Sequence, residues 1–229
     1  WLMGQGLAPN EPYNNPWRGH QLGKKPKGVF RNGLSDEVIL KLLKAHYSTD
    51  RYAVVIADLL RLGLLTGARL DELCALERSD VEKDSKGYWI NIREGKTDAA
   101  ARRVPIHKAG AGIIKRRLAD KDQYLFAGLI PGGPDRKRSW NVSKAYGRFR
   151  KHAGVSERGQ DFHALRTTFM SRMEGLGIPE STTKLLVGHV RESMTYGYYS
   201  QGELVRRREA ISKLKFNSAI MTALTKAPS

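Results

Sequence analysis

Two short strand-like runs interrupt a chain in which apolar residues otherwise recur at helical spacing. The runs are GYWINI at 87–92 and RRVPI at 102–106, and the segment REGKTDAAA joins them. Runs of this kind, separated by a short polar and Gly-containing connection, are typical of a hairpin. We therefore expect a mixed α/β fold that is mainly α-helical, with one small antiparallel β-sheet containing residues 87–106. Lys96 would lie at or near the turn of that hairpin.

Helical patterns occupy most of the remaining chain. Ser35 is suited to cap a helix whose first turn contains acidic residues. A second helix is expected from Ala53 to near Gly67, and a third begins around Arg69. Further helices are expected over 108–119, 139–152, 162–175, 180–187 and 203–215.

The two ends of the chain differ from this helical middle. Residues 1–33 are rich in Gly, Pro, Asn and Lys, which is typical of a linker or arm. The sequence begins with Trp1 rather than Met, so we expect further N-terminal domains to precede it. Residues 217–229 follow an amphipathic pattern over 203–215 and are expected to form a C-terminal tail, which either packs in cis or docks onto a neighbouring subunit. The folded domain would then cover residues 34–216.

The chain is strongly basic. Its 40 Lys and Arg residues outnumber its 23 Asp and Glu residues, and the formal net charge of +17 indicates a polyanionic partner. The single cysteine, Cys74, excludes an internal disulfide framework and a multi-cysteine zinc site, and it favours a reducing, cytosolic setting. The most apolar run, YAVVIADLLRLGLL, contains Asp58 and Arg61, so it is not a membrane span.

Two candidate functional residues lie in the first half of the chain. In TGARLDEL, Arg69 follows a Thr-Gly turn and opens a helix, and Glu72 is placed three residues later to orient its guanidinium. Taken alone, this pair is more typical of a surface ion pair. Lys96 in EGKT is of low specificity by itself, because a lysine on a tight hairpin is usually solvated.

The other candidates lie in the second half. In DFHALRTTF, His163 and Arg166 are spaced to share one helix face, which suits a phosphate. In LLVGHVRESMTYGYYS, His189 follows a glycine and precedes three tyrosines. Alternatively, His163 could be a polar residue at the edge of its helix, and His189 could be a capping or packing residue. A metal role is disfavoured because no carboxylate or cysteine stands at ligand spacing around them.

The order of these motifs is more specific than any one of them. Arg, Lys, His-x-x-Arg, Gly-His and Tyr follow one another in the stretches LLTGARLDELCALERSDV, EGKT, RRVPIH, FHALRTTF, LLVGH and SMTYGYYS. In this order they resemble the catalytic domain of the tyrosine recombinases, the phage integrase family, over residues ~34 to ~200. The resemblance implies that family's DNA breaking-rejoining catalytic fold for residues 34–216. It also implies that residues 1–33 lead from a missing N-terminal core-binding domain.

The resemblance implies metal- and ATP-independent DNA cleavage, without a cofactor, through a 3′-phosphotyrosyl intermediate. Arg69 and Arg166 would clamp the nonbridging oxygens, and His189 would add a hydrogen bond to the same phosphate. His163 would accept the proton of the tyrosine, and Lys96 would protonate the departing 5′ oxygen.

The nucleophile is assigned to Tyr199, with Tyr198 as the alternative. Some family members place the nucleophile nine residues after the Gly-His histidine, which would select Tyr198. This chain resembles instead the branch that ends Met-Thr-aromatic-Gly-x-Tyr-Ser, in which the last tyrosine attacks. Tyr196 is expected to be a packing residue.

The implied partners are double-stranded DNA at recombination or attachment sites, a homo-tetramer of the chain on that DNA, and accessory DNA-bending proteins. The implied role is integration or excision of a mobile element by a bacterial or phage-encoded, cytoplasmic and nucleoid-associated enzyme. Two other functions stay open: a type IB topoisomerase that relaxes supercoils as a monomer, and a DNA-binding relative that has lost activity. The integrase-style motifs disfavour the first, and the filled catalytic positions disfavour the second.

Overall fold

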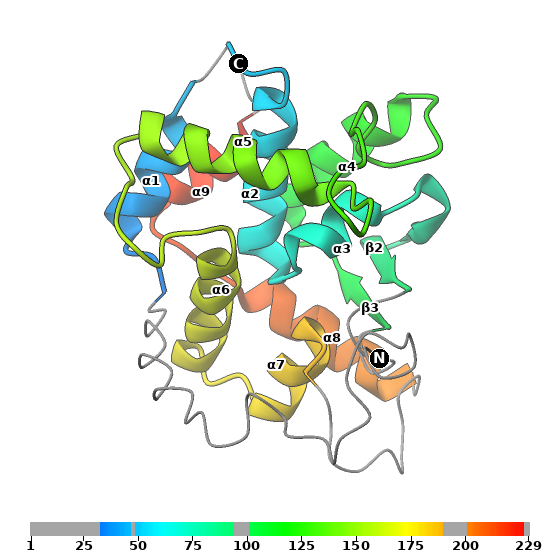
Figure 1. The fold of residues 1–229 in the computed structure, drawn as a ribbon. Coiled ribbons are helices and arrows are strands. Elements are labelled where there is room, and N and C mark those ends of the chain that lie inside the picture. Colours follow the sequence, from blue (N-terminus) through cyan, green and yellow to red (C-terminus); the bar gives the residue numbers. More distant parts are fainter. Residues whose placement is uncertain (1–32, 47–48, 94–100, 190–200, 227–229) are drawn as a thin grey trace, which may run out of the picture. The chain divides into compact units, whose positions relative to one another are not determined.

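A computed structural model of the chain describes residues 33–46, 49–93, 101–189 and 201–226. Helices dominate, and the described strands form one three-stranded antiparallel sheet of order β1-β2-β3 (Figure 1). The mainly helical fold with a small antiparallel sheet that the sequence predicts is therefore confirmed. The helices are α1 (Asp36–Lys44), α2 (Ala53–Thr66), α3 (Leu70–Ala75), α4 (Ala111–Ala119), α5 (Ser139–His152), α6 (His163–Gly175), α7 (Glu180–Val187), α8 (Gln201–Lys213) and α9 (Ser218–Thr225). The strands are β1 (Val81–Asp84), β2 (Gly87–Ile92) and β3 (Arg102–Pro105), and short 3-10 turns occur at η1 (Arg78–Asp80) and η3 (Lys108–Gly110).

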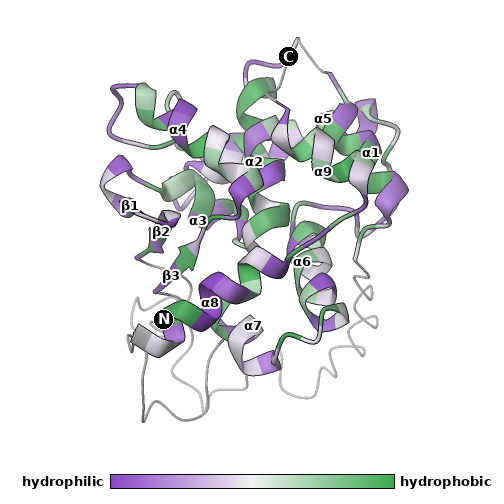
Figure 2. Ribbon diagram, turned by 180° about the vertical axis from the view of Figure 1, so that it is seen from behind, coloured by the Kyte–Doolittle hydropathy of each residue, from purple (hydrophilic) through white to green (hydrophobic). Residues whose placement is uncertain are grey.

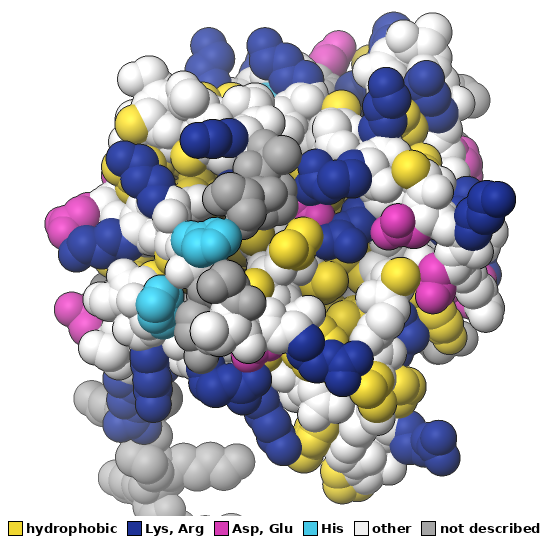
Figure 3. Space-filling view, turned by 90° about the horizontal axis from the view of Figure 1, so that it is seen from above, with side chains coloured by type: hydrophobic (Ala, Val, Ile, Leu, Met, Phe, Trp, Pro, Cys, Tyr) yellow, Lys and Arg dark blue, Asp and Glu magenta, His cyan; other side chains and the backbone are white. Residues whose placement is uncertain are grey.

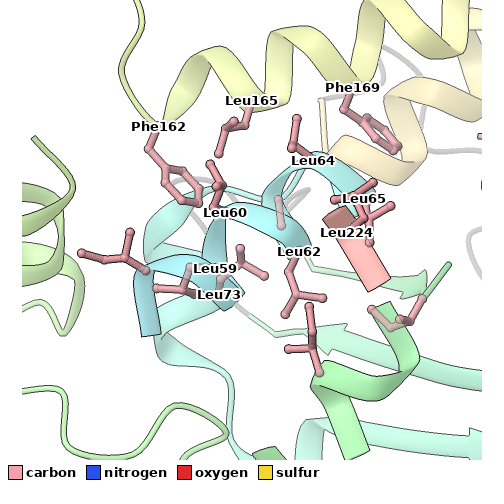
Figure 4. Packing of buried hydrophobic residues seen from close by; sticks show 14 of the residues in the cluster. Leu59, Leu60, Leu62, Leu64, Leu65, Leu73, Phe162, Leu165, Phe169 and Leu224 are labelled. Carbon is pink, nitrogen blue, oxygen red and sulfur yellow. The ribbon is translucent and has the colours of Figure 1, made fainter. Parts of the chain in front are cut away.

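Helix α2 lies at the centre of the core. Its leucines are fully buried, because the helix is apolar on all sides and other helices surround it. Figure 4 shows Leu60 and Leu64 of α2 facing Phe162, Leu165 and Phe169, which belong to α6 and the residue before it. This packing fixes the start of α6 against the end of α2.

The end of α2 is set by Gly67. This residue has φ +65°, and a Cβ there would lie 2.5 Å from Cδ1 of Phe169. Glycine is therefore required both for the left-handed backbone and for the close approach of α6. The chain leaves α2 at this point and enters α3 two residues later, at Arg69.

The two charges inside the apolar run of α2 are paired within the protein. The buried Asp58 carboxylate accepts hydrogen bonds from Arg116 and Arg117 of α4. Burial raises the pKa of Asp58, although both arginines oppose this change. Arg61 donates to the carbonyls of Ala57, Leu43 and Ala223. Among the described residues, no helix is both long and apolar enough to cross a membrane.

The sheet contains one strand that the sequence patterns missed. Strand β1 has the polar sequence VEKD and pairs with β2 from Val81 opposite Ile90 to Asp84 opposite Gly87. It is an exposed edge strand, so it lacks the apolar alternation by which a strand is recognised. Figure 2 shows the hydrophilic character of β1. The two predicted strands pair as expected, with Ile92 opposite Arg102 at the end next to their connection.

The C-terminal tail contains a further helix, α9, which packs against α1 of the same chain. Asn217 caps it, because the side-chain oxygen accepts from the backbone N–H of Ile220 at 2.9 Å. Ile220 and Leu224 are buried, and the Asn217 amide donates to Asp36 at 3.0 Å. Segment 217–226 therefore completes the core in cis.

We expect the substitution Leu224→Ala to lower the free energy of unfolding by about 2–4 kcal/mol, because it leaves a cavity where a side chain only 1% exposed had packed. Chemical denaturation monitored by circular dichroism measures the change. Thr222→Ala, at an exposed position of the same helix, is the matched control and should cost much less. Equal losses for the two variants would show that α9 does not belong to the cooperative core.

Candidate active site

Arg69 lies at the start of α3, and its side chain extends from the buried Glu72 carboxylate to the surface. The Glu72 carboxylate accepts from the backbone N–H of Arg69 at 2.8 Å and from Nη1 of its guanidinium, also at 2.8 Å. The Arg69 side chain is 37% exposed, whereas the Glu72 side chain is 3% exposed. The guanidinium is thus fixed at one edge and open to solvent at the other.

Glu72 also binds a second arginine that sequence reasoning missed. Arg102 of β3 donates to Glu72 from Nη1 at 3.1 Å and from Nη2 at 2.7 Å. Burial acts to raise the pKa of the Glu72 carboxyl, but the hydrogen bonds and charge of Arg102, with the bonds from Arg69, lower it overall. A signal for Arg102 was present in RRVPI, because residues 102 and 104 of a strand share one face and Val104 is apolar.

Arg166 lies on α6 with only 1% of its surface exposed. Its Nη1 donates to the carbonyl of Gly67 at 2.9 Å. Its Nε and Nη2 are buried and have no hydrogen-bond partner within the described part of the chain. Burial, followed by the charges of Arg69 and Arg102, lowers the pKa of Arg166 to about 9. A buried cation with two open donors is an incomplete arrangement that an anion would complete.

His189 follows the end of α7. Gly188 ends that helix with φ +71°, and the His189 backbone N–H donates to the carbonyl of Lys184 at 3.0 Å. The imidazole is exposed. Desolvation, followed by the charges of Arg166 and Arg69, lowers its pKa. The neutral ring is therefore favoured at neutral pH, and it lies within the electrostatic field of both arginines.

The structure shows less about the remaining candidate residues. His163 is the first residue of α6, one turn before Arg166, and its side chain is exposed. Lys96, Tyr198 and Tyr199 lie outside the described residues. The structure thus brings together Arg69, Arg166 and His189, with Glu72 and Arg102 behind them.

This cluster is suited to an anion rather than to a metal. Two arginines and a histidine from three separate segments share it, and the one carboxylate, Glu72, is already paired with two guanidinium groups. In the described ranges, no group of three or more His, Cys, Asp or Glu residues could hold a metal ion. A forked guanidinium in a fixed position is a strong partner for a phosphate.

Comparison with known proteins shows the family of the chain. The family model described as "Phage integrase family" matches residues 33–203. Tyrosine recombinase XerA of Thermococcus kodakarensis is 32% identical over 205 residues, which cover 86% of this chain and 68% of that protein. The integrase of Escherichia phage lambda is 27% identical over 176 residues, which cover 74% of this chain and 47% of that protein. The chain thus spans about half the length of the phage integrases that it matches.

Solved structures show the same fold at lower sequence identity. The integrase from mycobacterium phage Brujita superposes with a TM-score of 0.62 at 20% identity, covering 99% of this chain and 72% of that one. A lambda integrase dimer bound to a COC′ core site has a TM-score of 0.59 at 21% identity, covering 90% of this chain and 54% of that one. The matched residues 33–203 include the arginine and histidine cluster, and the chain belongs to the phage integrase family, whose members include the tyrosine recombinases.

Proposed function

We propose that this chain is the catalytic part of a site-specific DNA recombinase that cleaves and rejoins DNA through a 3′-phosphotyrosyl intermediate. The observation that carries the proposal is the buried guanidinium of Arg166, whose Nε and Nη2 have no partner in the described residues. A scissile phosphate would bring the nonbridging oxygens that these donors lack. Family membership supplies the reaction class, and the cluster supplies the place for the phosphate.

In the proposed reaction, the phosphate lies against Arg69, Arg166 and His189. The transition state spreads negative charge over the nonbridging oxygens, and donors fixed before the reaction stabilise that charge without reorganising. His189 contributes a hydrogen bond rather than a full charge, because its lowered pKa favours the neutral ring. Glu72 holds the Arg69 guanidinium in place.

Three further residues would complete the chemistry. The Oη of Tyr199, or of the alternative Tyr198, attacks phosphorus and gives its proton to His163. The bond from phosphorus to the 5′ oxygen breaks, and Lys96 protonates that oxygen. The products are a 3′-phosphotyrosyl link and a 5′ hydroxyl. Attack by another strand's 5′ hydroxyl on this link rejoins DNA without an external energy source.

Double-stranded DNA is the proposed partner, at paired recombination or attachment sites. The net charge of +17 supports a polyanionic substrate, and Lys and Arg side chains outnumber acidic ones on the face seen in Figure 3. A lambda integrase tetramer bound to a Holliday junction has a similar fold, with a TM-score of 0.59. We propose a homo-tetramer of this chain on DNA by analogy, with accessory DNA-bending proteins.

The proposed organisation assigns residues 1–33 to an arm from a core-binding domain and residues 34–216 to the catalytic domain, onto which the C-terminal tail of residues 217–229 packs through α9. The proposed role is integration or excision of a mobile element in a cell whose nucleoid DNA the enzyme contacts. The cytoplasm is the proposed location, because that is where a bacterial or phage-encoded enzyme meets such DNA.

Helix α5 offers a candidate surface for the DNA backbone. Lys144 and Lys151 are exposed on one side of the helix, and Arg148 between them pairs with Asp50. The Lys144 ammonium lies 4.6 Å from the ring centroid of Trp140, which is 41% exposed. A row of cations with an adjoining aromatic ring is suited to phosphates and sugars.

We expect the double variant Lys144→Gln, Lys151→Gln to weaken DNA binding and to reduce the salt slope of log Kd by about 2, because each phosphate contact contributes about 1. Fluorescence anisotropy between low and moderate salt measures the slope. The cleavage rate at saturating DNA should not change. Lys41→Gln is the control, because Glu37 already pairs with Lys41 at 2.8 Å. A slope equal to that of the control would exclude α5 as a phosphate surface.

A suicide-substrate assay tests the proposed function. A nicked recombination site lets the short 5′ fragment diffuse away after cleavage, so a covalent protein–DNA complex accumulates. Covalent trapping that depends on the site sequence supports a recombinase. Relaxation of plasmids without such a site would indicate a topoisomerase instead, and binding without a covalent adduct would indicate a DNA-binding module.

A further inference from the structure

Arg102 is more deeply buried than any role at the DNA surface would require. Its side chain has no exposed surface. It lies at the start of β3 and pairs with Ile92, the last residue of β2, at the end of the hairpin whose connection contains Lys96. An arginine is costly to bury without paired donors, so its contacts indicate what the burial achieves.

The first contact is with the helix that presents Arg69. Both terminal nitrogens of Arg102 donate to the Glu72 carboxylate, which also accepts the backbone N–H and Nη1 of Arg69. The planar fork of arginine suits this two-point contact, and a lysine ammonium cannot reproduce it. Arg102 therefore fixes the carboxylate that fixes Arg69.

The second contact is with the end of α7, immediately before His189. The Nε of Arg102 donates to the carbonyl of Leu186 at 2.8 Å. A Cβ on Gly188 would lie 2.6 Å from Nη1 of Arg102, and Gly188 also has φ +71°. Glycine is required there for both reasons, and the close approach couples the backbone before His189 to the Arg102 guanidinium.

We propose that Arg102 is a positioning residue that sets Arg69 and His189 relative to each other by holding Glu72 on one side and the Leu186–Gly188 turn on the other. Arg102 thereby connects the segment that contains Arg69 with the segment that contains His189. It contacts both from the protein interior and is not proposed to bind the phosphate. This inference rests on the proposed function only for the consequence on cleavage, because the positioning itself is a property of the protein without DNA.

The test uses Arg102→Lys, which keeps the charge and removes the fork. The control is Arg103→Lys on the same strand, whose side chain is 27% exposed and pairs with Glu82. The first readout is the NMR signal of the His189 ring in the protein without DNA. We expect this signal to shift or broaden in Arg102→Lys and to stay in place in Arg103→Lys. The His152 ring on α5 should not move in either variant.

The second readout separates binding from chemistry on a suicide duplex. We expect the single-turnover cleavage rate at saturating DNA to fall about 10- to 100-fold in Arg102→Lys, with the Kd for DNA within about twofold of the original. A general loss of folding would instead change the His152 signal and the thermal midpoint together. If Arg102→Lys does not fold, Glu72→Gln serves as the second variant, and the same shift of the His189 signal is expected.

An unchanged His189 signal in a folded variant would overturn the inference, and so would a loss of DNA affinity with an unchanged cleavage rate. If the original protein forms no covalent complex at all, the proposed function fails. The His189 measurement then still decides whether Arg102 positions this segment.

Discussion

Replacing Arg166 with Ala should reduce the single-turnover cleavage rate at saturating DNA by at least about 1,000-fold, because two fixed donors to the transition state are lost. DNA affinity should change little, since many other phosphate contacts persist. Trapping on a suicide duplex and anisotropy at the same salt concentration measure the two quantities. Arg166→Lys should also cleave poorly, because lysine lacks the planar fork.

Arg172→Ala is the matched control for this prediction. Arg172 lies on the same helix, and it pairs with Asp36 away from the cluster. Its loss should lower stability modestly and leave the cleavage rate near that of the original protein. A near-normal covalent complex from Arg166→Ala would contradict the role of Arg166, and so would a loss of affinity as large as the loss of rate.

Arg166 should also carry a stability cost in the protein without DNA. Its pKa in the folded protein is lowered to about 9, and its ordinary value is higher. Below pH 9 the guanidinium is charged in both the folded and the unfolded chain, so the cost of burying the charge is fully present. A buried guanidinium that is positioned to bind a phosphate therefore lowers the stability of the protein without DNA.

The second large effect concerns the nucleophile. Tyr199→Phe should abolish the covalent product, because phenylalanine has no oxygen to attack phosphorus. Tyr198→Phe should retain it, because the motif order assigns the attack to Tyr199. The assay is covalent attachment to a suicide duplex, with noncovalent binding as the control for folding. The reverse outcome would assign the attack to Tyr198.

Much of the fold could be predicted from the sequence, because many of its elements are determined by residues that are close together in the chain. Ser35 accepts from the backbone N–H of Val38, as a capping residue should, and α2 ends at Gly67 as its pattern predicts. The two strand-like runs pair in the expected sheet. Each of these elements has a signal within a few residues of itself.

Other features depend on partners that are distant in the sequence. Strand β1 is polar because it forms an exposed edge of the sheet. Its sequence has no apolar alternation, and only its pairing with β2 shows that it is a strand. Helix α9 is short and is stabilised by burial of Ile220 and Leu224 against the N-terminal part of the fold. Neither element could be recognised from local pattern alone.

The candidate site likewise contains residues with a local sequence signal and one residue whose role depends on distant partners. Motif order identified Arg69, Arg166 and His189, which the structure places within one another's electrostatic influence. Arg102 was missed because its function depends on Glu72 and Leu186, which come from two other elements. A strand position beside a valine indicated that Arg102 faces inward, but only the structure shows what it binds.

The chemistry of the bond between protein and DNA tests directly whether this chain cleaves DNA through a 3′-phosphotyrosyl intermediate. A suicide duplex labelled on the strand to be cleaved is incubated with the protein in a chelator and without nucleotide, and the adduct is digested and mapped by mass spectrometry. We expect a single DNA-linked peptide, joined through the 3′ phosphate to Tyr199. A link to a 5′ phosphate, an adduct that forms only with added divalent metal, or no adduct on any site that the protein binds would contradict it.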